Sequence, residues 1–274
     1  MPADDSGRSR GPAATAPGRR RPDQIPGGHH GLSPEEVAES QRARILEAMR
    51  AAVAEHGYQD ASVADVIKRA GVSRKTFYAQ FEDKEACFVV AYDEHVRRLQ
   101  AIVLDAFDAQ DDWVPALRAG LTALLNALAY DPALARFCFV DVLAAGPKAA
   151  QRRNEAMRAL EEILELGARE QDGGDGDAAV LPRALGMSMV GGLGEVLYQE
   201  IVAGRAERLP EQVPDLMYAL VLPFEGQEAA ERELNRGPRR TAPLSGIAAT
   251  GRGGRARGPS IDRGEGRGRR PTSL

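Results

Sequence analysis

The sequence predicts an all-α protein, and three features of the chain support that prediction. Apolar residues recur at spacings of three and four, the period of a helix, and long stretches of strand-like alternation are absent. Hydrophobic residues make up 43% of the 274 residues but aromatic residues only 5%, a balance that suits helices rich in alanine and leucine. The two ends, residues 1–31 and 236–274, are rich in glycine, proline and arginine and cannot bury a core. We therefore expect about nine helices between two disordered tails.

Two helices are expected at the start of the folded region. The first begins near Pro34, because proline is pre-organised for the first turn of a helix, and it ends at Gly57. The second follows Ser62, a good N-cap residue. Gly71 ends this second helix, because glycine adopts the left-handed cap geometry that a β-carbon would penalise.

A third helix is expected directly after Ser73, which is also an N-cap residue. Phe77 is its buried anchor, and Phe81 closes it. The remaining positions are polar: Arg74, Lys75, Thr76, Tyr78 and Gln80. A helix capped by glycine, a short turn and a second helix with a polar face form a helix-turn-helix, a motif of proteins that read DNA.

Six further helices are expected after this motif. Glycine, proline and aspartate mark their ends, which gives the approximate ranges 83–109, 112–130, 132–145, 147–171, 182–203 and 211–224. The range 182–203 contains several interior glycines, and each of them costs about 1 kcal/mol of helix propensity. That cost indicates a helix against which another backbone packs closely.

Charge is divided unevenly along the chain. The net charge is −4, but residues 1–31 carry +2 and residues 236–274 carry +8, which leaves −14 for residues 32–235. Such a division lets a small head turn its basic residues to phosphates while an acidic body is repelled from the duplex. The arginine-rich C-terminal tail is interpreted either as a solvated tail or as a non-specific phosphate tether.

The remaining composition argues for a cytoplasmic protein without metal or cofactor. Cys87 and Cys138 lie far apart in apolar helices, so free buried thiols are expected rather than a disulfide. The longest uncharged run, 119–130, falls short of the roughly 20 residues that span a bilayer, and the N-terminus lacks an apolar signal segment. The loop 172–177 lacks the downstream glutamate of a calcium site. No membrane partner is expected.

The order of residues within 62–85 resembles the DNA-binding domain of the TetR (tetracycline repressor) family. The chain matches the family pattern at Ser62, Val63, Val66, Ala70, Gly71, Val72, Ser73, Thr76, Phe77, Tyr78, Phe81, Asp83, Lys84 and Glu85. It departs at Ile67, where alanine is usual, and at Lys75 and Gln80, where glycine and an aromatic residue or histidine are common. The resemblance is specific over residues 38–86 and only architectural over 87–225.

The resemblance implies a DNA-binding domain at residues 32–86 followed by an effector-binding and dimerisation domain at 87–235. It also implies contacts to DNA from the matching positions Ser62, Arg74, Lys75, Thr76, Tyr78 and Gln80. By their charge, Lys84 at the start of the next helix and Arg44 on the first helix are further candidates for phosphate contact. Alternatives remain open, because serines can serve as caps alone and helical arginines are often simply solvated.

In the same family the last two helices build a four-helix dimer bundle, and the preceding helices surround an effector pocket. The resemblance therefore implies a homodimer, with Gly191, Gly194, Leu216 and Leu220 as interface candidates; the alternative is that these residues close the core of one protomer. Candidates for the pocket lining are Phe107, Trp113, Phe137, Phe139, Asp141 and Tyr198, although helical aromatic residues are often plain core. Asp141 either pairs with a nearby arginine or faces the pocket, where it would favour a cationic or hydrogen-bonding effector.

The predicted function is a sequence-specific, DNA-binding transcriptional regulator, a repressor released from a palindromic operator when a small molecule binds. Two alternatives stay open: a regulator that activates, and a non-enzymatic, dimeric helical adaptor. An enzyme is not expected, because the sequence shows no nucleophile–base pair, no metal-spaced set of histidine and cysteine, and no glycine-rich phosphate loop.

Overall fold

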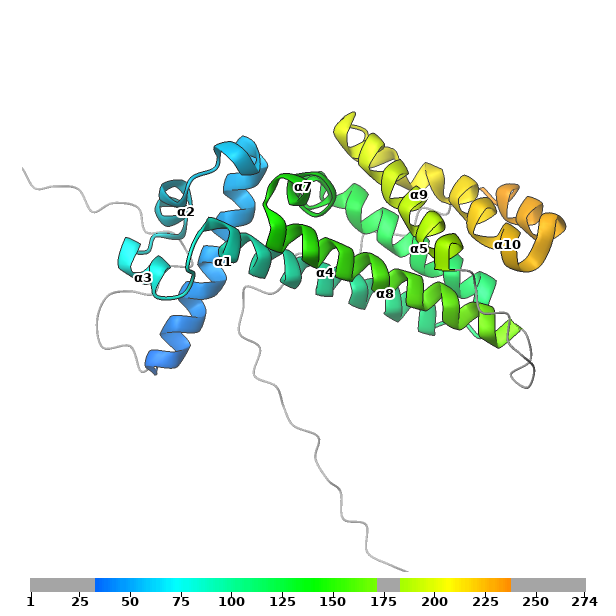
Figure 1. Cartoon of the computed structure of the whole chain (residues 1–274), viewed down its shortest axis with the longest axis horizontal. Helices are drawn as coiled ribbons and strands as arrows, with labels where there is room; N and C mark the ends of the chain where they lie inside the picture. The colour runs from blue at the N-terminus through cyan, green and yellow to red at the C-terminus, as the bar shows by residue number, and fades with distance from the viewer. Residues whose placement is uncertain (1–32, 172–182, 238–274) are drawn as a thin grey trace, which may run out of the picture.

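The computed structural model describes residues 33–171 and 183–237, which form an elongated, all-α molecule and confirm the predicted fold class (Figure 1). A small N-terminal domain of three helices lies at one end, and a larger helical domain extends away from it. The predicted tails, apart from residues 236–237, and the loop 172–177 lie outside the described residues.

The described residues contain ten α-helices, one π-helix (η1) and one 3-10 helix (η2). In chain order they are α1 (Pro34–Asp60), α2 (Val63–Ala70), α3 (Arg74–Tyr78), α4 (Lys84–Asp108), α5 (Trp113–Tyr130), α6 (Pro132–Arg136), η1 (Phe137–Asp141), α7 (Val142–Ala144), α8 (Pro147–Gln171), α9 (Arg183–Val202), η2 (Ala206–Gln212) and α10 (Val213–Leu234).

Local capping explains the three helices of the N-terminal domain, here called the head. Ser62 and Asp65 form a capping box in which the Ser62 side chain accepts from the Asp65 backbone N–H at 3.2 Å and the Asp65 carboxylate accepts from the Ser62 N–H at 3.0 Å. Gly71 ends α2 in the left-handed conformation, with φ at 65°. The expected ends of these helices are therefore confirmed, including a break of α1 at Gly57, where φ is 75°.

Two elements differ from the expectation. The helix expected up to residue 145 is interrupted by the π-turn η1, which separates α6 from α7. The last helix continues beyond its expected end at 224 through a kink at Gly226 to Leu234. Tertiary contacts explain the continuation, because Phe224 packs edge-on against Trp113 with ring centroids 4.9 Å apart and Glu233 is paired with Arg118 of α5.

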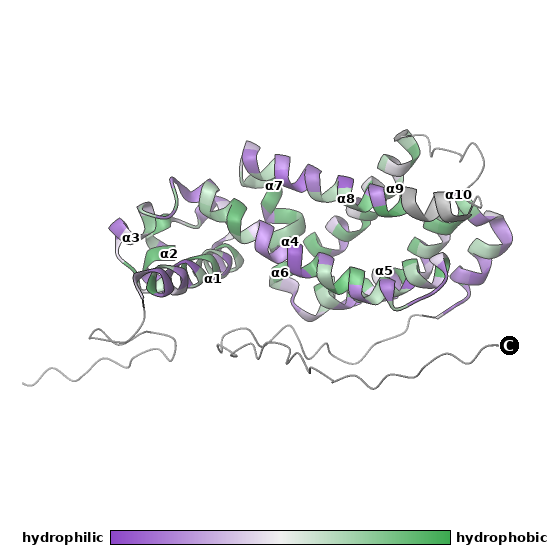
Figure 2. Ribbon diagram, turned by 90° about the horizontal axis from the view of Figure 1, so that it is seen from below, coloured by the Kyte–Doolittle hydropathy of each residue, from purple (hydrophilic) through white to green (hydrophobic). Residues whose placement is uncertain are grey.

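The core runs without a break from the head into the larger domain. Buried residues of α1 such as Ile45 and Met49 belong to the same apolar cluster as Phe88 of α4 and Leu128 of α5. Figure 2 shows α5 as mostly hydrophobic, whereas α1 and α8 alternate between hydrophilic and hydrophobic residues, as expected of helices with one solvent-exposed face.

Candidate nucleic-acid interface and internal cavity

The exposed face of α3 carries two free cations of the helix-turn-helix. Phe77 is fully buried and anchors α3 in the core of the head. Arg74 and Lys75 are exposed, and neither side chain has a hydrogen bond or ion pair within the described part of the chain. Tyr78 is 49% exposed. The face therefore offers two cations and one phenol to a partner in solution.

Two serines of the helix-turn-helix cap its second and third helices. The Ser73 side chain accepts from the backbone N–H of Thr76 at 3.0 Å and bonds the Thr76 hydroxyl at 2.8 Å. Ser62 is exposed at the start of α2, where its hydroxyl donates to the Asp65 carboxylate at 2.5 Å and thereby holds the pKa of that carboxyl below its usual value. Both serines have a capping role whether or not they also contact DNA.

Arg44 and Gln80 are turned toward the protein. Arg44 donates from Nη1 to the carbonyl of Ala70 at 3.0 Å and so caps the C-terminus of α2, while its buried Nε has no partner. Gln80 donates to the carbonyl of Ala38 on α1 at 3.4 Å, and its Oε1 is buried without a partner. In this structure both side chains hold the head together.

Lys84 also bonds within the protein. Its ammonium donates to the carbonyls of Tyr58 at 2.8 Å and Ala61 at 3.0 Å, and it lies 4.2 Å from the centroid of the Tyr58 ring. Burial lowers the pKa of Lys84 below its ordinary value. The side chain thus ties the start of α4 to the end of α1, and the expected phosphate contact would require it to give up these bonds.

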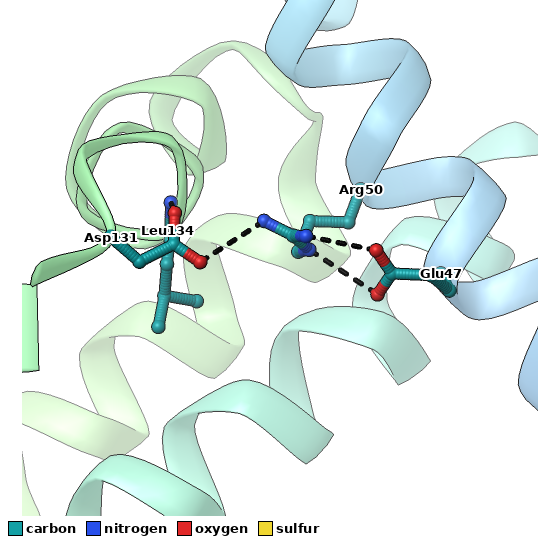
Figure 3. A network of polar contacts seen from close by, with 4 residues as sticks. All are labelled: Glu47, Arg50, Asp131 and Leu134. Carbon is teal, nitrogen blue, oxygen red and sulfur yellow. Dashed lines mark hydrogen bonds and ion pairs between the residues drawn. The ribbon is translucent and has the colours of Figure 1, made fainter. Parts of the chain in front are cut away.

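Arg50 joins the head to the larger domain (Figure 3). From α1 its guanidinium reaches Glu47 at 2.8 Å and Asp131 at 3.3 Å, and the other oxygen of Asp131 caps α6 by accepting from the backbone N–H of Leu134 at 2.9 Å. The hydrogen bond to Glu47 and the two nearby carboxylates raise the pKa of Arg50 above its ordinary value. Sequence reasoning missed this link, because its partners are 81 residues apart.

Asp141 forms a second link at the same junction. It is 4% exposed and lies 3.6 Å from the Nε of Arg136, and its Oδ1 lies 4.0 Å from the β-carbon position of Gly57 at the kink of α1. Burial raises its pKa, against the opposing effect of Arg136. Of the two interpretations of Asp141, the structure favours pairing with a nearby arginine, and Asp141 does not line the cavity described next.

A cavity of about 330 Å³ lies between α4 and α8 and is also lined by residues of α5 and η1. Its walls are largely aliphatic and include Val96, Leu99, Leu160 and Ile163. A second space of about 60 Å³ adjoins it toward Phe107 and shares several of its walls. The larger volume lies within the range of small-molecule sites.

The structure divides the six candidates for the pocket lining. Phe139 lines the cavity and Phe107 lines the smaller space. Trp113 packs against α10, and Phe137 is buried between Phe88 and His95, at centroid distances of 4.5 and 5.6 Å. Tyr198 lines neither space. The rings of Trp113 and Phe137 fill the core rather than line the cavity, because burial of their large apolar area is favourable wherever a helix face is covered.

Three polar residues of the cavity were missed: Tyr92, Gln100 and Arg153. The available signal was the periodicity of α4, since Tyr92, Val96 and Leu99 share one helix face. Arg153 gave no signal, because helical arginines are most often solvated.

The structure also divides the four candidates for a dimer interface into buried and exposed residues. Gly194 is buried against α8, where an added β-carbon would lie 3.9 Å from the Nη2 of Arg153 and the Sδ of Met157. Leu216 and Leu220 are buried in the core of the protomer. Gly191 faces outward with nothing within 4 Å of the β-carbon position. The structure therefore favours the alternative for three of the four residues, which close the protomer.

The described residues contain no group of three histidine, cysteine or acidic side chains able to hold a metal ion. None of the helices within them is long and apolar enough to cross a membrane. Cys87 and Cys138 are free and buried, as expected, and burial raises the pKa of each thiol to about 12.

Comparison with known proteins agrees with this geometry. Residues 45–91 match the family model of bacterial regulatory proteins of the tetR family. The chain is 25% identical over 162 residues to the HTH-type transcriptional activator FasR of Mycolicibacterium smegmatis, covering 59% of this chain and 69% of FasR. It is 31% identical over 96 residues to the HTH-type transcriptional repressor AcnR of Corynebacterium diphtheriae, covering 31% of this chain and 50% of AcnR. The curated relatives are matched over 35% to 74% of their own lengths.

A solved structure supports the same fold over the larger domain. The transcriptional regulator FadR of Bacillus subtilis, solved in complex with stearoyl-CoA, superposes with a TM-score of 0.57 at 20% identity, covering 67% of this chain and 98% of FadR. The match extends well beyond the head. The helix-turn-helix domain in α1 to α3 is therefore that of the TetR family of transcriptional regulators, and the helical domain after it has the same fold as that of FadR.

Proposed function

We propose that this chain acts as a homodimeric repressor, which binds a palindromic operator and is released when a small molecule enters the cavity between α4 and α8. The observation that carries the proposal is the exposed face of α3, where Arg74 and Lys75 lie free beside Tyr78. Uncompensated cations on a rigidly anchored helix are what the edges and phosphates of a major groove require.

Each residue of the α3 face has a distinct proposed contact. Arg74 and Lys75, at the N-terminal end of α3, would donate to guanine O6 and N7. Tyr78 projects one turn further on and suits a phosphate or a base edge, while Thr76 offers a hydroxyl and a methyl group. Ser62 would contact the DNA backbone. Arg44, Gln80 and Lys84 contribute by positioning α1, α2 and α4 around this face.

A single head of this size would bind weakly, so two heads related by a two-fold axis would read two half-sites. The proposed dimer surface is the outward side of α9, where Met187 is 52% exposed and Gly191 permits a close approach. Gly194, Leu216 and Leu220 are buried in the protomer, so the proposed dimer surface includes only Gly191 of the four interface candidates.

Release by a ligand rests on the junction between the domains. Phe139 and Cys138 of η1 line the cavity, and Asp141 of the same turn lies beside Gly57 at the kink of α1. A ligand that moves η1 or α4 therefore changes the support of the head and the spacing of the two heads. Activation is the second candidate, because FasR is an activator; the position of the operator relative to the promoter distinguishes the two. Either role places the protein in the cytoplasm with the DNA and needs no catalytic step.

The test is selection of genomic fragments by the purified full-length chain, followed by gel shifts at two salt concentrations. We expect a short palindrome that is still bound at the higher salt, and a loss of affinity of about 5- to 150-fold in Arg74→Ala and Tyr78→Ala. Arg208→Ala, an exposed arginine of η2, is the control and should leave binding unchanged. Binding without sequence preference that collapses with salt would contradict the proposal.

A further inference from the structure

The cavity between α4 and α8 has one polar end and one apolar end. The two helices run side by side in the same direction. The backbone N–H of Lys148 donates to Glu85 at 2.7 Å, and further along both helices Arg152 pairs with Asp93 at 3.4 Å. Arg153 therefore lies level with Tyr92, at the end near the head. The opposite end, ten residues later on α8, is walled by aliphatic residues such as Leu104 and Ile163.

The polar end holds hydrogen-bond donors without partners. Arg152 is paired with Asp93 and Glu155, but its neighbour Arg153, half-buried in the cavity wall, has no hydrogen bond or ion pair within the described residues. The hydroxyl of Tyr92 has no hydrogen-bond partner among them either. Both groups line the same cavity, and the charge of Arg153 lowers the pKa of Tyr92 against the larger, opposite effect of burial.

No carboxylate is present among the described residues that line this cavity. The acidic side chains of Asp93 and Glu155 line an adjoining groove and are already engaged by Arg152. A half-buried guanidinium beside an apolar space has less water around it than an exposed one, and Arg153 has no counter-ion among the described residues to stabilise its charge. An anion that enters the cavity would supply that counter-ion.

We propose that the cavity binds an anionic amphiphile, a carboxylate on an unbranched hydrocarbon chain, with the carboxylate on Arg153 and Tyr92 and the chain lying between α4 and α8 toward Ile163. The span from Arg153 to Ile163 is about 15 Å along α8, which fits an extended chain of about twelve carbons. The charge is opposite to the cationic effector that an Asp141 facing the pocket would have favoured. The proposal rests on the proposed function for its regulatory consequence, but the binding itself does not require DNA.

The test is calorimetric titration of the full-length chain with three ligands that share a twelve-carbon chain, each kept below micelle formation: dodecanoate, dodecanol and dodecyltrimethylammonium. We expect dodecanoate to bind at least about tenfold more tightly than the alcohol, because a charged bidentate pair replaces a neutral hydrogen bond. Equal or tighter binding of the alcohol or the cation would overturn the proposal.

Variants assign the selectivity to the polar end. Arg153→Met removes the charge while keeping a long side chain against Gly194, and it should bring the ratio of dodecanoate to dodecanol affinities close to one. Retained dodecanol binding shows that the variant is folded. Tyr92→Phe should lower the ratio by about threefold. Arg158→Met, an exposed arginine on the same helix, should leave it unchanged. A ratio that stays high in Arg153→Met would overturn the proposal.

A thioester is the other source of the same chemistry. Dodecanoyl-CoA carries its anions on the phosphates rather than at the chain end, so its binding would depend on Arg97 of the adjoining groove. Binding of the thioester without any binding of dodecanoate would contradict the site proposed here. Operator affinity with and without dodecanoate is measured separately: selective binding that leaves operator affinity unchanged supports this site and contradicts the proposed release.

Discussion

The free cations of the head and of the cavity lie in opposite surroundings. Arg74 and Lys75 extend into water from an exposed helix, whereas Arg153 lies half-buried beside an aliphatic space. In water a free cation costs little and attracts phosphates over about 10 Å at moderate salt. Beside an apolar cavity the same charge is costly until an anion reaches it. The first arrangement suits a reversible search along DNA, and the second suits selection of one small molecule.

Between these two regions, three cations are engaged within the protein. Arg44, Arg50 and Lys84 each bond to a carbonyl or a carboxylate and fasten the head to itself or to the larger domain. Position relative to the junction, rather than residue type, therefore separates the cations that position helices from those that are free to bind a partner. The following four predictions test this division.

The largest effect is expected from Phe77→Ala, which removes the anchor under the free cations of α3. The ring is fully buried, so the variant should lose about 3–5 kcal/mol of unfolding free energy. Thermal denaturation followed by circular dichroism measures the loss, and operator binding should fall with it. If the operator were bound normally by a destabilised head, the buried anchor would not be what positions these charges.

The pH dependence of stability tests whether the junction between the domains disfavours a charged His95. Burial, with help from Arg50 and Arg98, lowers its pKa to about 4, against the opposing effect of Glu47 and Asp131. The unfolded chain then binds a proton near pH 6.5 that the folded chain does not, so stability should fall by about 3 kcal/mol as the pH drops from 6.5 to 4. Denaturant titrations at several pH values measure this slope. His95→Gln should flatten it, and an unchanged slope would place the effect elsewhere.

Lys84 and Lys75 form a matched pair, one engaged and one free. Lys84→Met leaves the carbonyls of Tyr58 and Ala61 without a donor and should cost about 1–3 kcal/mol of stability. Lys75→Met should leave stability within about 0.5 kcal/mol and weaken operator binding instead. Chemical denaturation and gel shifts on both variants separate the roles. If Lys84→Met left the free energy of unfolding unchanged, contact with a DNA phosphate would be the main role of Lys84.

Among the residues that are engaged within the protein, the smallest effect on stability is expected from Arg50→Met at the interdomain link. The pair with Asp131 is partly exposed, so its loss should cost at most about 1 kcal/mol. Arg50→Met should have a larger effect on the coupling between the cavity and the head. The ratio of operator affinities with and without dodecanoate should shrink toward one. Anisotropy titrations with a labelled operator measure that ratio. Glu47→Gln, which touches Arg50 from the same helix, is the control and should preserve it.

The N-terminal helices could be predicted closely because their limits depend on neighbours in the chain. Ser62, Gly71 and Ser73 act on backbone groups within three or four residues, so the residue type alone determines the cap. The buried anchor Phe77 and the exposed positions around it follow from the same short period. Sequence by itself therefore determined the helix-turn-helix, its family and its exposed polar face.

The cavity and the interfaces depended on contacts between distant segments. Periodicity shows which helix face is apolar but not which helix covers it, so Gly194 and Leu220 could equally have met a second protomer or, as found, their own. In the same way only the packing of α8 on α4 decided that Arg153 borders a cavity while Asp141 pairs with Arg136. A side chain's partners set its electrostatic role, and those partners are chosen by the tertiary structure.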